Sequence, residues 1–346
     1  MQEKPNVLII YTGGTIGMVK DLKTDELKAF DFNYMYEYIP ELERFNVNLK
    51  TVSFEKPVDS SEVNSTHWLE IAKTVFDNYV QYDGFVILHG SDTMAYTASA
   101  LSFILQGLKK PIILTGSQLP IGTIRTDGKE NLITAIEIAS AKKDGEPIIQ
   151  EVAVYFEYSL YRGNRCSKVS ANQFEAFKSP NYLELAVAGV NINYATSYLF
   201  RTKENELQFN KEMSSQVGLL KIFPGINTNF FPGLFDVSNI KGLVIETYGS
   251  GNAQSDKNLQ DNLSKYIASG GVVLNVTQCN SGSVNQGKYE TSSFFQKIGV
   301  VSGYDMTTEA ALTKMMYLLG TGASREAIIQ NLQKSLVGEV TIENNY

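Results

Sequence analysis

The sequence predicts an α/β protein with two parallel-sheet domains, a larger N-terminal one and a smaller C-terminal one. Short apolar runs recur along the chain, and stretches with helical periodicity follow them, as is typical of parallel sheets covered on both faces. The chain has 346 residues, more than one hydrophobic core usually supports. Polar residues without periodicity between about 191 and 216 predict a linker, which would separate domains 1–190 and 217–346.

The first predicted strand, Val7 to Ile10, leads directly into the turn Thr12-Gly13-Gly14-Thr15-Ile16-Gly17. Two adjacent glycines permit positive φ angles and allow another group to approach the backbone closely. The turn would therefore display two hydroxyls beside exposed backbone N–H groups, which suits a nucleophile and its anion-binding donors. Taken alone, the same six residues are equally compatible with an ordinary turn at a strand end.

Two further apolar strands end in the same way. Residues 84–88 lead into His89-Gly90-Ser91-Asp92-Thr93 and a helix over 94–108, and residues 112–114 lead into Thr115-Gly116-Ser117-Gln118. Ligands of open parallel sheets bind outside the carboxyl ends of the strands. We therefore expect the three loops to converge on one site.

Helix signals place several polar residues between these strands. A helix over 65–79 would be capped by Ser65 or Thr66, which leaves Asp59 and Ser60 free on the preceding loop. Asp127 precedes a helix over 128–141, and Glu130 follows at the spacing of a capping box, so a capping role is expected for Asp127.

The elements of the second half repeat the alternation of strand and helix. The predicted strands are 217–223, 242–245 and 272–276, and the predicted helices are 257–268, 308–319 and 324–336. A strand over 152–156 closes the first half and precedes the cation-dense segment 161–168.

Composition excludes several classes of partner. There are 30 Lys and Arg against 37 Asp and Glu, a net charge of −7, and no basic stripe interleaved with aromatic residues, so neither nucleic acid nor an anionic membrane is expected to bind. No run approaches the roughly 18 apolar residues of a membrane span, and the N-terminus lacks a signal-peptide pattern. A cytoplasmic protein is expected, with Cys166 and Cys279 reduced.

The inventory of reactive residues narrows the chemistry. The two histidines, His67 and His89, are not at metal-ligand spacing, and the fingerprints of dinucleotide and P-loop sites are missing, so we expect neither a metal nor a cofactor. A hydrolase without a catalytic histidine remains. Its hydroxyl nucleophile would need a base, and Lys168 qualifies if Arg162 and Arg165 lower its pKa.

Asp92 could hold that lysine or bind a substrate ammonium. Two ordinary alternatives remain at this point: residues 91–93 as the N-cap of the following helix, and Lys168 as a solvated surface lysine.

Several motifs, in order along the chain, resemble those of the bacterial-type L-asparaginases. The two family signatures are matched by Thr12-Gly13-Gly14-Thr15-Ile16-Gly17 and by 85–94, which contains His89-Gly90-Ser91-Asp92-Thr93. Residues 115–118, 125–128, 161–165 and Thr277-Gln278-Cys279 resemble the cytoplasmic, type I branch. The resemblance extends from about residue 7 to residue 338.

This resemblance implies two α/β domains, hydrolysis of asparagine to aspartate and ammonia without a cofactor, and a homodimer or homotetramer. It makes Thr15 the nucleophile of a threonine acyl-enzyme, and it gives Ser91, Asp92 and Lys168 the role of a second hydroxyl-acid-lysine set. The residues it implies in substrate binding are Asp59, Ser60, Ser61, Ser91 and Asp92.

The sequence departs from the family at two places in this site. Ser91 is threonine in the usual signature, and the hydroxyl survives with only a methyl lost. Segment 23–28 lacks the tyrosine that the family commonly places there, which leaves the group that activates Thr15 unassigned. The polar stretch around this segment is either a solvated loop or a lid over the turn.

A third departure concerns regulation. Cooperative type I enzymes bind a second asparagine at the loop that corresponds to Thr277 and Cys279, where an arginine holds the effector carboxylate. Glu246 stands at the position of that arginine, so we expect no activation by asparagine and only core-edge packing for Thr277 and Cys279.

Two other functions remain open. One is an amidotransferase that delivers ammonia to a charged tRNA, which the net charge and the expected absence of an added domain disfavour. The other is a non-enzymatic amino-acid sensor, which the presence of Thr15, Ser91, Asp92 and Lys168 together disfavours. Asparagine and glutamine both remain possible substrates, because one methylene is worth only about 1 to 3 kcal/mol in a pocket.

Overall fold

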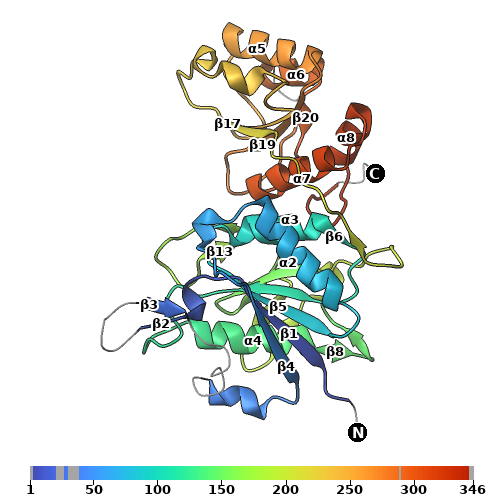
Figure 1. Cartoon of the computed structure of the whole chain (residues 1–346). Helices are drawn as coiled ribbons and strands as arrows, with labels where there is room; N and C mark the ends of the chain where they lie inside the picture. Colours follow the sequence, from blue (N-terminus) through green and yellow to red (C-terminus); the bar gives the residue numbers. More distant parts are fainter. Residues whose placement is uncertain (1–2, 21–26, 30–38, 288–289, 343–346) are drawn as a thin grey trace. The chain divides into compact units, whose positions relative to one another are not determined.

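The protein, seen in a computed structural model, is described over residues 3–20, 27–29, 39–287 and 290–342, and it divides into two compact units between Phe209 and Asn210 (Figure 1). The sequence predicted a linker over 191–216, but much of this stretch is part of unit 1. Its first part belongs to unit 1, because Ile192–Tyr194 pairs with Ala186–Ala188 and Gln208–Phe209 pairs with Leu105–Gln106. Polar composition alone does not reveal these short edge pairings.

Unit 1 is built on an eight-stranded sheet with the order β15-β14-β11-β10-β7-β5-β1-β4. Its strands are β1 (Asn6–Tyr11), β4 (Asn48–Ser53), β5 (Gly84–Leu88), β7 (Ile112–Thr115), β10 (Val152–Phe156), β11 (Ser159–Arg162), β14 (Ala186–Ala188) and β15 (Ile192–Tyr194). Strands β4, β1, β5, β7 and β10 are parallel, and β11, β14 and β15 continue the sheet antiparallel. The α/β prediction is confirmed, and the strands before the three polar loops are direct neighbours.

Helices cover both faces of this sheet. Helix α4 (Gly128–Ser140) lies on one face, while α2 (Ser65–Asn78) and α3 (Met94–Ile104) lie on the other (Figure 1). Every residue of β5 is buried, and so are Val7 to Tyr11 of β1. Burial on both faces explains why these strands are continuous apolar runs without alternation.

Short two-stranded pairings decorate the sheet. They are formed by β2 (Met18–Lys20) with β3 (Leu27–Ala29), β6 (Leu105–Gln106) with β16 (Gln208–Phe209), β8 (Lys142–Lys143) with β9 (Glu146–Pro147), and β12 (Ser167–Lys168) with β13 (Phe177–Lys178). The β6–β16 pair ends α3 at Ile104, four residues before the predicted end at 108. This stop depends on a partner about a hundred residues further along the chain, which local periodicity cannot report.

Unit 2 is a parallel sheet with the order β17-β18-β19-β20. The strands are β17 (Val217–Lys221), β18 (Gly242–Thr247), β19 (Val272–Thr277) and β20 (Val301–Ser302), and the helices are α5 (Lys257–Ala268), α6 (Glu290–Ile298), α7 (Thr308–Gly320) and α8 (Arg325–Leu332). Leu243 and Ile245 pack in one core with α5 and α6, whereas Val244 packs in the other with α7 and α8. Alternate residues of β18 thus serve opposite faces.

Among the described residues, no helix is both long enough and apolar enough to cross a membrane.

Candidate active site

The turn that carries Thr15 follows β1 directly. Gly13 and Gly14 have φ angles of 135° and 84°, which side chains rarely adopt, so the turn depends on both glycines. Thr15 begins a short 3₁₀ helix, Thr15–Gly17, and is half-buried. The hydroxyl of Tyr11 donates to the Gly17 carbonyl at 3.0 Å and fixes the far end of this helix.

Tyr11 itself is not poised to act as a base. Its ring is buried, and burial raises the pKa of its hydroxyl to about 12. In segment 23–28, where the family commonly places a tyrosine, only residues 27 and 28 fall within the described backbone. The predicted lid thus lies largely outside the described residues.

The turns that follow β1 and β5 lie side by side at this edge of the sheet, because the two strands are neighbours, and the loop before α2 packs against both. A Cβ at Gly13 would lie 2.1 Å from the Val58 carbonyl oxygen, and a Cβ at Gly14 would lie 2.4 Å from the Gly90 nitrogen. The Val58 N–H also donates to the Thr12 carbonyl at 2.8 Å. The glycines therefore let the turn after β1 lie directly against the loop before α2 and the turn after β5.

The loop before α2 is shaped by its own carboxylate. Asp59 Oδ1 accepts the backbone N–H of Ser61 at 2.8 Å and the Ser61 hydroxyl at 2.7 Å. These two bonds hold the pKa of Asp59 below its ordinary value, although the side chain is exposed. Ser60 is buried, and its carbonyl accepts the Thr93 hydroxyl at 2.6 Å, which ties this loop to the turn after β5.

Helix α2 is capped differently from the prediction of Ser65 or Thr66. Asn64 is the N-cap, its side chain accepts the Thr66 N–H at 3.0 Å, and His67 Nδ1 accepts the Asn64 N–H at 3.2 Å. His67 completes a capping box in place of the usual Glu or Gln, so it has a local structural role.

Lys168 lies between the two side chains with which it was predicted to act. Its Nζ is 2.9 Å from Ser91 Oγ and 2.6 Å from Asp92 Oδ1. The lysine side chain is 16% exposed and the aspartate 65% exposed, so the lysine is largely buried whereas the carboxylate of Asp92 is open to solvent. A solvated surface lysine would not be held by two side chains that are 77 and 76 residues away in sequence.

The capping alternative for residues 91–93 does not match the geometry. Thr93 is the N-cap residue of α3, but no side chain there accepts a capping bond. The Thr93 hydroxyl instead donates to Ser60, while Ser91 and Asp92 both contact Lys168.

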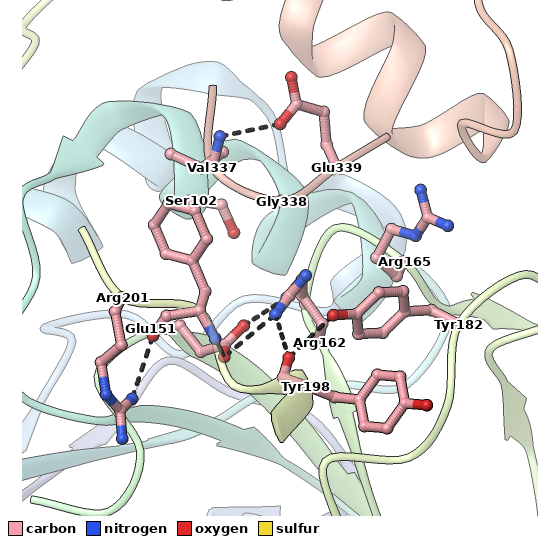
Figure 2. A network of polar contacts seen from close by, with 12 residues as sticks. Ser102, Glu151, Arg162, Arg165, Tyr182, Tyr198, Arg201, Val337, Gly338 and Glu339 are labelled. Atoms are coloured by element: carbon pink, nitrogen blue, oxygen red, sulfur yellow. Dashed lines mark hydrogen bonds and ion pairs between the residues drawn. The ribbon is translucent and has the colours of Figure 1, made fainter. Parts of the chain in front are cut away.

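Arg162, six residues before Lys168, is held in place by buried neighbours (Figure 2). Arg162 and Glu151 form an almost completely buried ion pair at 2.6 Å, and Arg162 also donates to the Tyr198 carbonyl at 2.7 Å. The guanidinium lies 4.4 Å from the centre of the Tyr182 ring. These contacts anchor the segment that carries Lys168, a role that the sequence prediction of a pKa effect did not include.

Asp127 has a role that sequence reasoning missed. It precedes α4 but forms no capping bond with its side chain. Its carboxylate accepts the N–H groups of Gln118 and Leu119 at 2.9 and 3.1 Å, which shapes the loop after β7. Glu130 instead accepts the Tyr155 hydroxyl at 2.6 Å, so the predicted capping box is wrong. The capping spacing is a local signal, and it gave no indication of these contacts across the loop.

The residues of the predicted regulatory loop lie in unit 2. Thr277 Oγ1 donates to the Gly249 carbonyl at 2.6 Å and accepts the Cys279 N–H at 3.0 Å. Cys279 is exposed, so the prediction that it packs at the edge of the core is wrong. Glu246 accepts the Thr308 hydroxyl at 2.6 Å and lies 3.3 Å from Lys221 Nζ.

In the part of the chain that the structure describes, no three His, Cys, Asp or Glu side chains are grouped so that they could hold a metal ion.

Comparison with known proteins adds two family matches. Residues 6–199 match the model of the asparaginase N-terminal domain, and residues 216–332 match that of the glutaminase/asparaginase C-terminal domain. L-asparaginase 1 of Escherichia coli K12 is 39% identical over 340 residues, which cover 98% of this chain and 99% of the relative. A glutamyl-tRNA(Gln) amidotransferase component of Pyrococcus abyssi is 31% identical, over 97% of this chain and 77% of the relative.

The fold has a close counterpart among solved structures. L-asparaginase I of Vibrio cholerae superimposes with a TM-score of 0.89 at 38% identity, covering 98% of this chain and all of the other.

Proposed function

The chain belongs to the asparaginase family, and from this membership we propose that it is an L-asparaginase, an amidohydrolase that converts L-asparagine to L-aspartate and ammonia. The observation that carries the proposal is that Lys168 contacts both Ser91 and Asp92. These two residues lie in the turn after β5, which packs against the turn that carries Thr15. A hydroxyl, a carboxylate and a lysine in contact, on a turn that packs against the turn of a second hydroxyl, suit a two-step acyl transfer.

In the first step, asparagine binds with its ammonium against Asp92 and its carboxylate on the hydroxyl side of the 59–61 loop, where Ser60 and Ser61 lie. Asp59 shapes that loop by holding Ser61. Thr15 Oγ attacks the side-chain amide carbon, the C–N bond breaks, and the nitrogen takes up a proton and leaves as ammonia. Backbone N–H groups of the converging turns stabilise the oxyanion, and one such donor is worth about 3 to 4 kcal/mol in other enzymes.

In the second step, Ser91 and Lys168 hold and activate a water molecule. The water attacks the β-aspartyl ester, the bond between the acyl carbon and Thr15 Oγ breaks, and the threonine oxygen regains its proton. Both steps are addition and elimination at a carbonyl carbon, with no change of oxidation state. The reaction therefore requires neither an electron donor or acceptor nor a cofactor.

We further propose a cytoplasmic enzyme that works as a homodimer or homotetramer. Resemblance to the type I branch supports both points.

The proposal is tested by ammonia release from free asparagine and from free glutamine, measured side by side with the purified chain and no added tRNA. Rapid release from asparagine is expected, and it separates an asparaginase from both a tRNA-dependent amidotransferase and a sensor. Release from neither amide, by a protein that is folded and binds aspartate, would contradict the proposal.

A further inference from the structure

A buried chain of hydrogen bonds leads from the packing of two helices to the turn that carries Ser91. Trp68 Nε1 of α2 donates to Thr97 Oγ1 of α3 at 3.0 Å, and Thr97 Oγ1 lies 2.9 Å from His89 Nε2. The other ring nitrogen, His89 Nδ1, lies 2.6 Å from the Gly90 carbonyl oxygen. His89 and Thr97 are essentially inaccessible to solvent. The proposed reaction makes no use of this histidine.

The chemistry of the partners fixes the direction of every bond in the chain. The Gly90 carbonyl can only accept, so the proton of the neutral His89 ring lies on Nδ1 and Nε2 is an acceptor. The Thr97 hydroxyl therefore donates to Nε2, and its oxygen accepts the indole N–H of Trp68, which can only donate. One neutral tautomer therefore satisfies all three contacts. Burial lowers the pKa of His89 to about 4, so the ring remains neutral in ordinary solution.

The chain ends on the peptide that precedes Ser91. Because a peptide group is planar, a bond that fixes the Gly90 carbonyl also fixes the orientation of the backbone at Ser91. Gly90 has no side chain that could hold this peptide. A Cβ at Gly90 would lie 2.5 Å from Ser60 Oγ, so neighbouring loops exclude one. On the other side of the turn, Ser91 Oγ must remain within 2.9 Å of Lys168 Nζ.

We propose that His89 is a positioning residue: its Nδ1–H holds the Gly90–Ser91 peptide in the orientation that keeps the Ser91 hydroxyl on Lys168. This inference rests on the proposed function, since its effect is on the step that Ser91 and Lys168 assist. The competing explanation is a core histidine that only contributes to stability. The two explanations differ in which ring nitrogen matters, because only Nδ1 faces the turn of the active site.

Two isosteric substitutions separate the two nitrogens. The side-chain amide nitrogen of asparagine can take the place of Nδ1, and the amide of glutamine can reach the place of Nε2. His89→Asn therefore keeps a donor for Gly90 and loses the contact with Thr97, whereas His89→Gln does the reverse. We expect His89→Gln to lower kcat by about 100-fold, the size of effect that a misplacement of about 1 Å can have. His89→Asn should retain kcat within about fivefold, and KM should change little in either variant.

Ser102→Ala is the matched control for burial. Ser102 is a buried hydroxyl of the same helix as Thr97, and it donates to the Ala98 carbonyl within the helix at 2.8 Å. Its loss should lower the unfolding temperature modestly and leave kcat unchanged. Equal values of kcat in His89→Asn and His89→Gln would overturn the inference while leaving the proposed function intact. A wild-type protein without activity on asparagine would contradict the proposed function instead.

A second measurement does not depend on whether the variants fold. The chain has two histidines, so nitrogen NMR of the wild-type protein labelled at histidine resolves both rings. His89 should be neutral and protonated at Nδ1, with shifts that do not change between about pH 8 and pH 5.5, well above its lowered pKa. A ring protonated at Nε2 would contradict the inference, because Nδ1 would then have no proton to donate to Gly90.

Discussion

Lys168 is the residue on which the second step of the proposed reaction depends, because it contacts both Ser91 and Asp92. Ser91→Ala and Lys168→Met should each lower kcat by at least about 100-fold, the loss expected without assisted proton transfer. The double variant should be little slower than either single one, since the two groups act as a unit. Initial rates with saturating asparagine measure this.

Ser91→Thr is the control for the first experiment. It restores the residue of the usual signature and keeps the hydroxyl, so it should remain active. If the losses in Ser91→Ala and Lys168→Met multiplied in the double variant, Lys168 would be an independent cation and not the partner of Ser91.

Asp59 is the residue whose charge should respond to pH. Bonds from Ser61 lower its pKa, so the carboxylate remains ionised in mildly acidic solution. Ser61→Ala removes one of the two bonds and should raise this pKa toward its ordinary value. Substrate binding is lost as pH falls through the pKa, so the acid limb of kcat/KM should move to higher pH. An unchanged acid limb, with a raised KM at all pH values, would show that Asp59 does not titrate in this range.

At the scale of elements, much of the fold could be predicted because strand and helix signals are local. The apolar runs before residues 11, 89 and 115 gave the correct strands, and their parallel order brought the loops together. Contacts between distant residues could not be predicted in the same way. Asp127 fitted a local capping rule but bonds to Gln118 and Leu119, and α3 ends early because β6 pairs with β16.

The site shows the same division. Glycines and hydroxyl-bearing residues at the ends of apolar strands predicted the turns of Thr15 and Ser91. Lys168 has a weaker signal: its cationic neighbours and the carboxylate of Asp92 made it a candidate base, and the resemblance to a family then grouped it with Ser91. The chain of hydrogen bonds through Thr97 and His89 could not be predicted from the sequence. Its residues come from separate elements, and buried residues of these amino-acid types are common in protein cores.

The prediction that asparagine does not activate the enzyme concerns Glu246 in β18 and Thr277 at the end of β19. A second asparagine bound at Thr277 and Cys279 would bring its carboxylate toward the carboxylate of Glu246. Two like charges about 4 Å apart repel by roughly 4 kcal/mol at a protein surface, more than the 1 to 3 kcal/mol of a typical allosteric coupling. Lys221 reduces this repulsion, but Thr308 holds the Glu246 carboxylate in place. Rates measured from far below to far above half-saturation should therefore follow a hyperbola. A sigmoidal curve that becomes hyperbolic in Thr277→Val would contradict this expectation.

At the scale of the molecule, the stability of unit 2 depends on a fully buried ion pair. Lys314 Nζ lies 2.6 Å from Glu339 Oε1, and it also donates to the Leu332 carbonyl at 3.2 Å. Glu339 in turn accepts the N–H of Val337 at 2.8 Å, so the pair fastens the segment after α8 to α7. Breaking a buried pair leaves one charge uncompensated, at a cost of about 3 to 5 kcal/mol.

Glu339→Gln should lower the free energy of unfolding by about that amount, measured by denaturant titration. Lys257→Ala is the matched control, because it removes an exposed pair with Asp261 and should change stability little. Equal effects of the two substitutions would show that the buried pair does not hold the C-terminal segment.

The proposed reaction places the acyl group on Thr15. Lys168→Met should slow the second step more than the first, so the protein quenched in acid during turnover should accumulate an aspartyl ester. Peptide mass analysis of that sample, with Thr15→Ala as the control, is the most direct measurement. We expect the added mass of an aspartyl group on the peptide that contains Thr15, and almost no turnover in Thr15→Ala. An adduct on Ser91 or Thr12, or a Thr15→Ala variant that retains more than about a tenth of the wild-type rate, would contradict it.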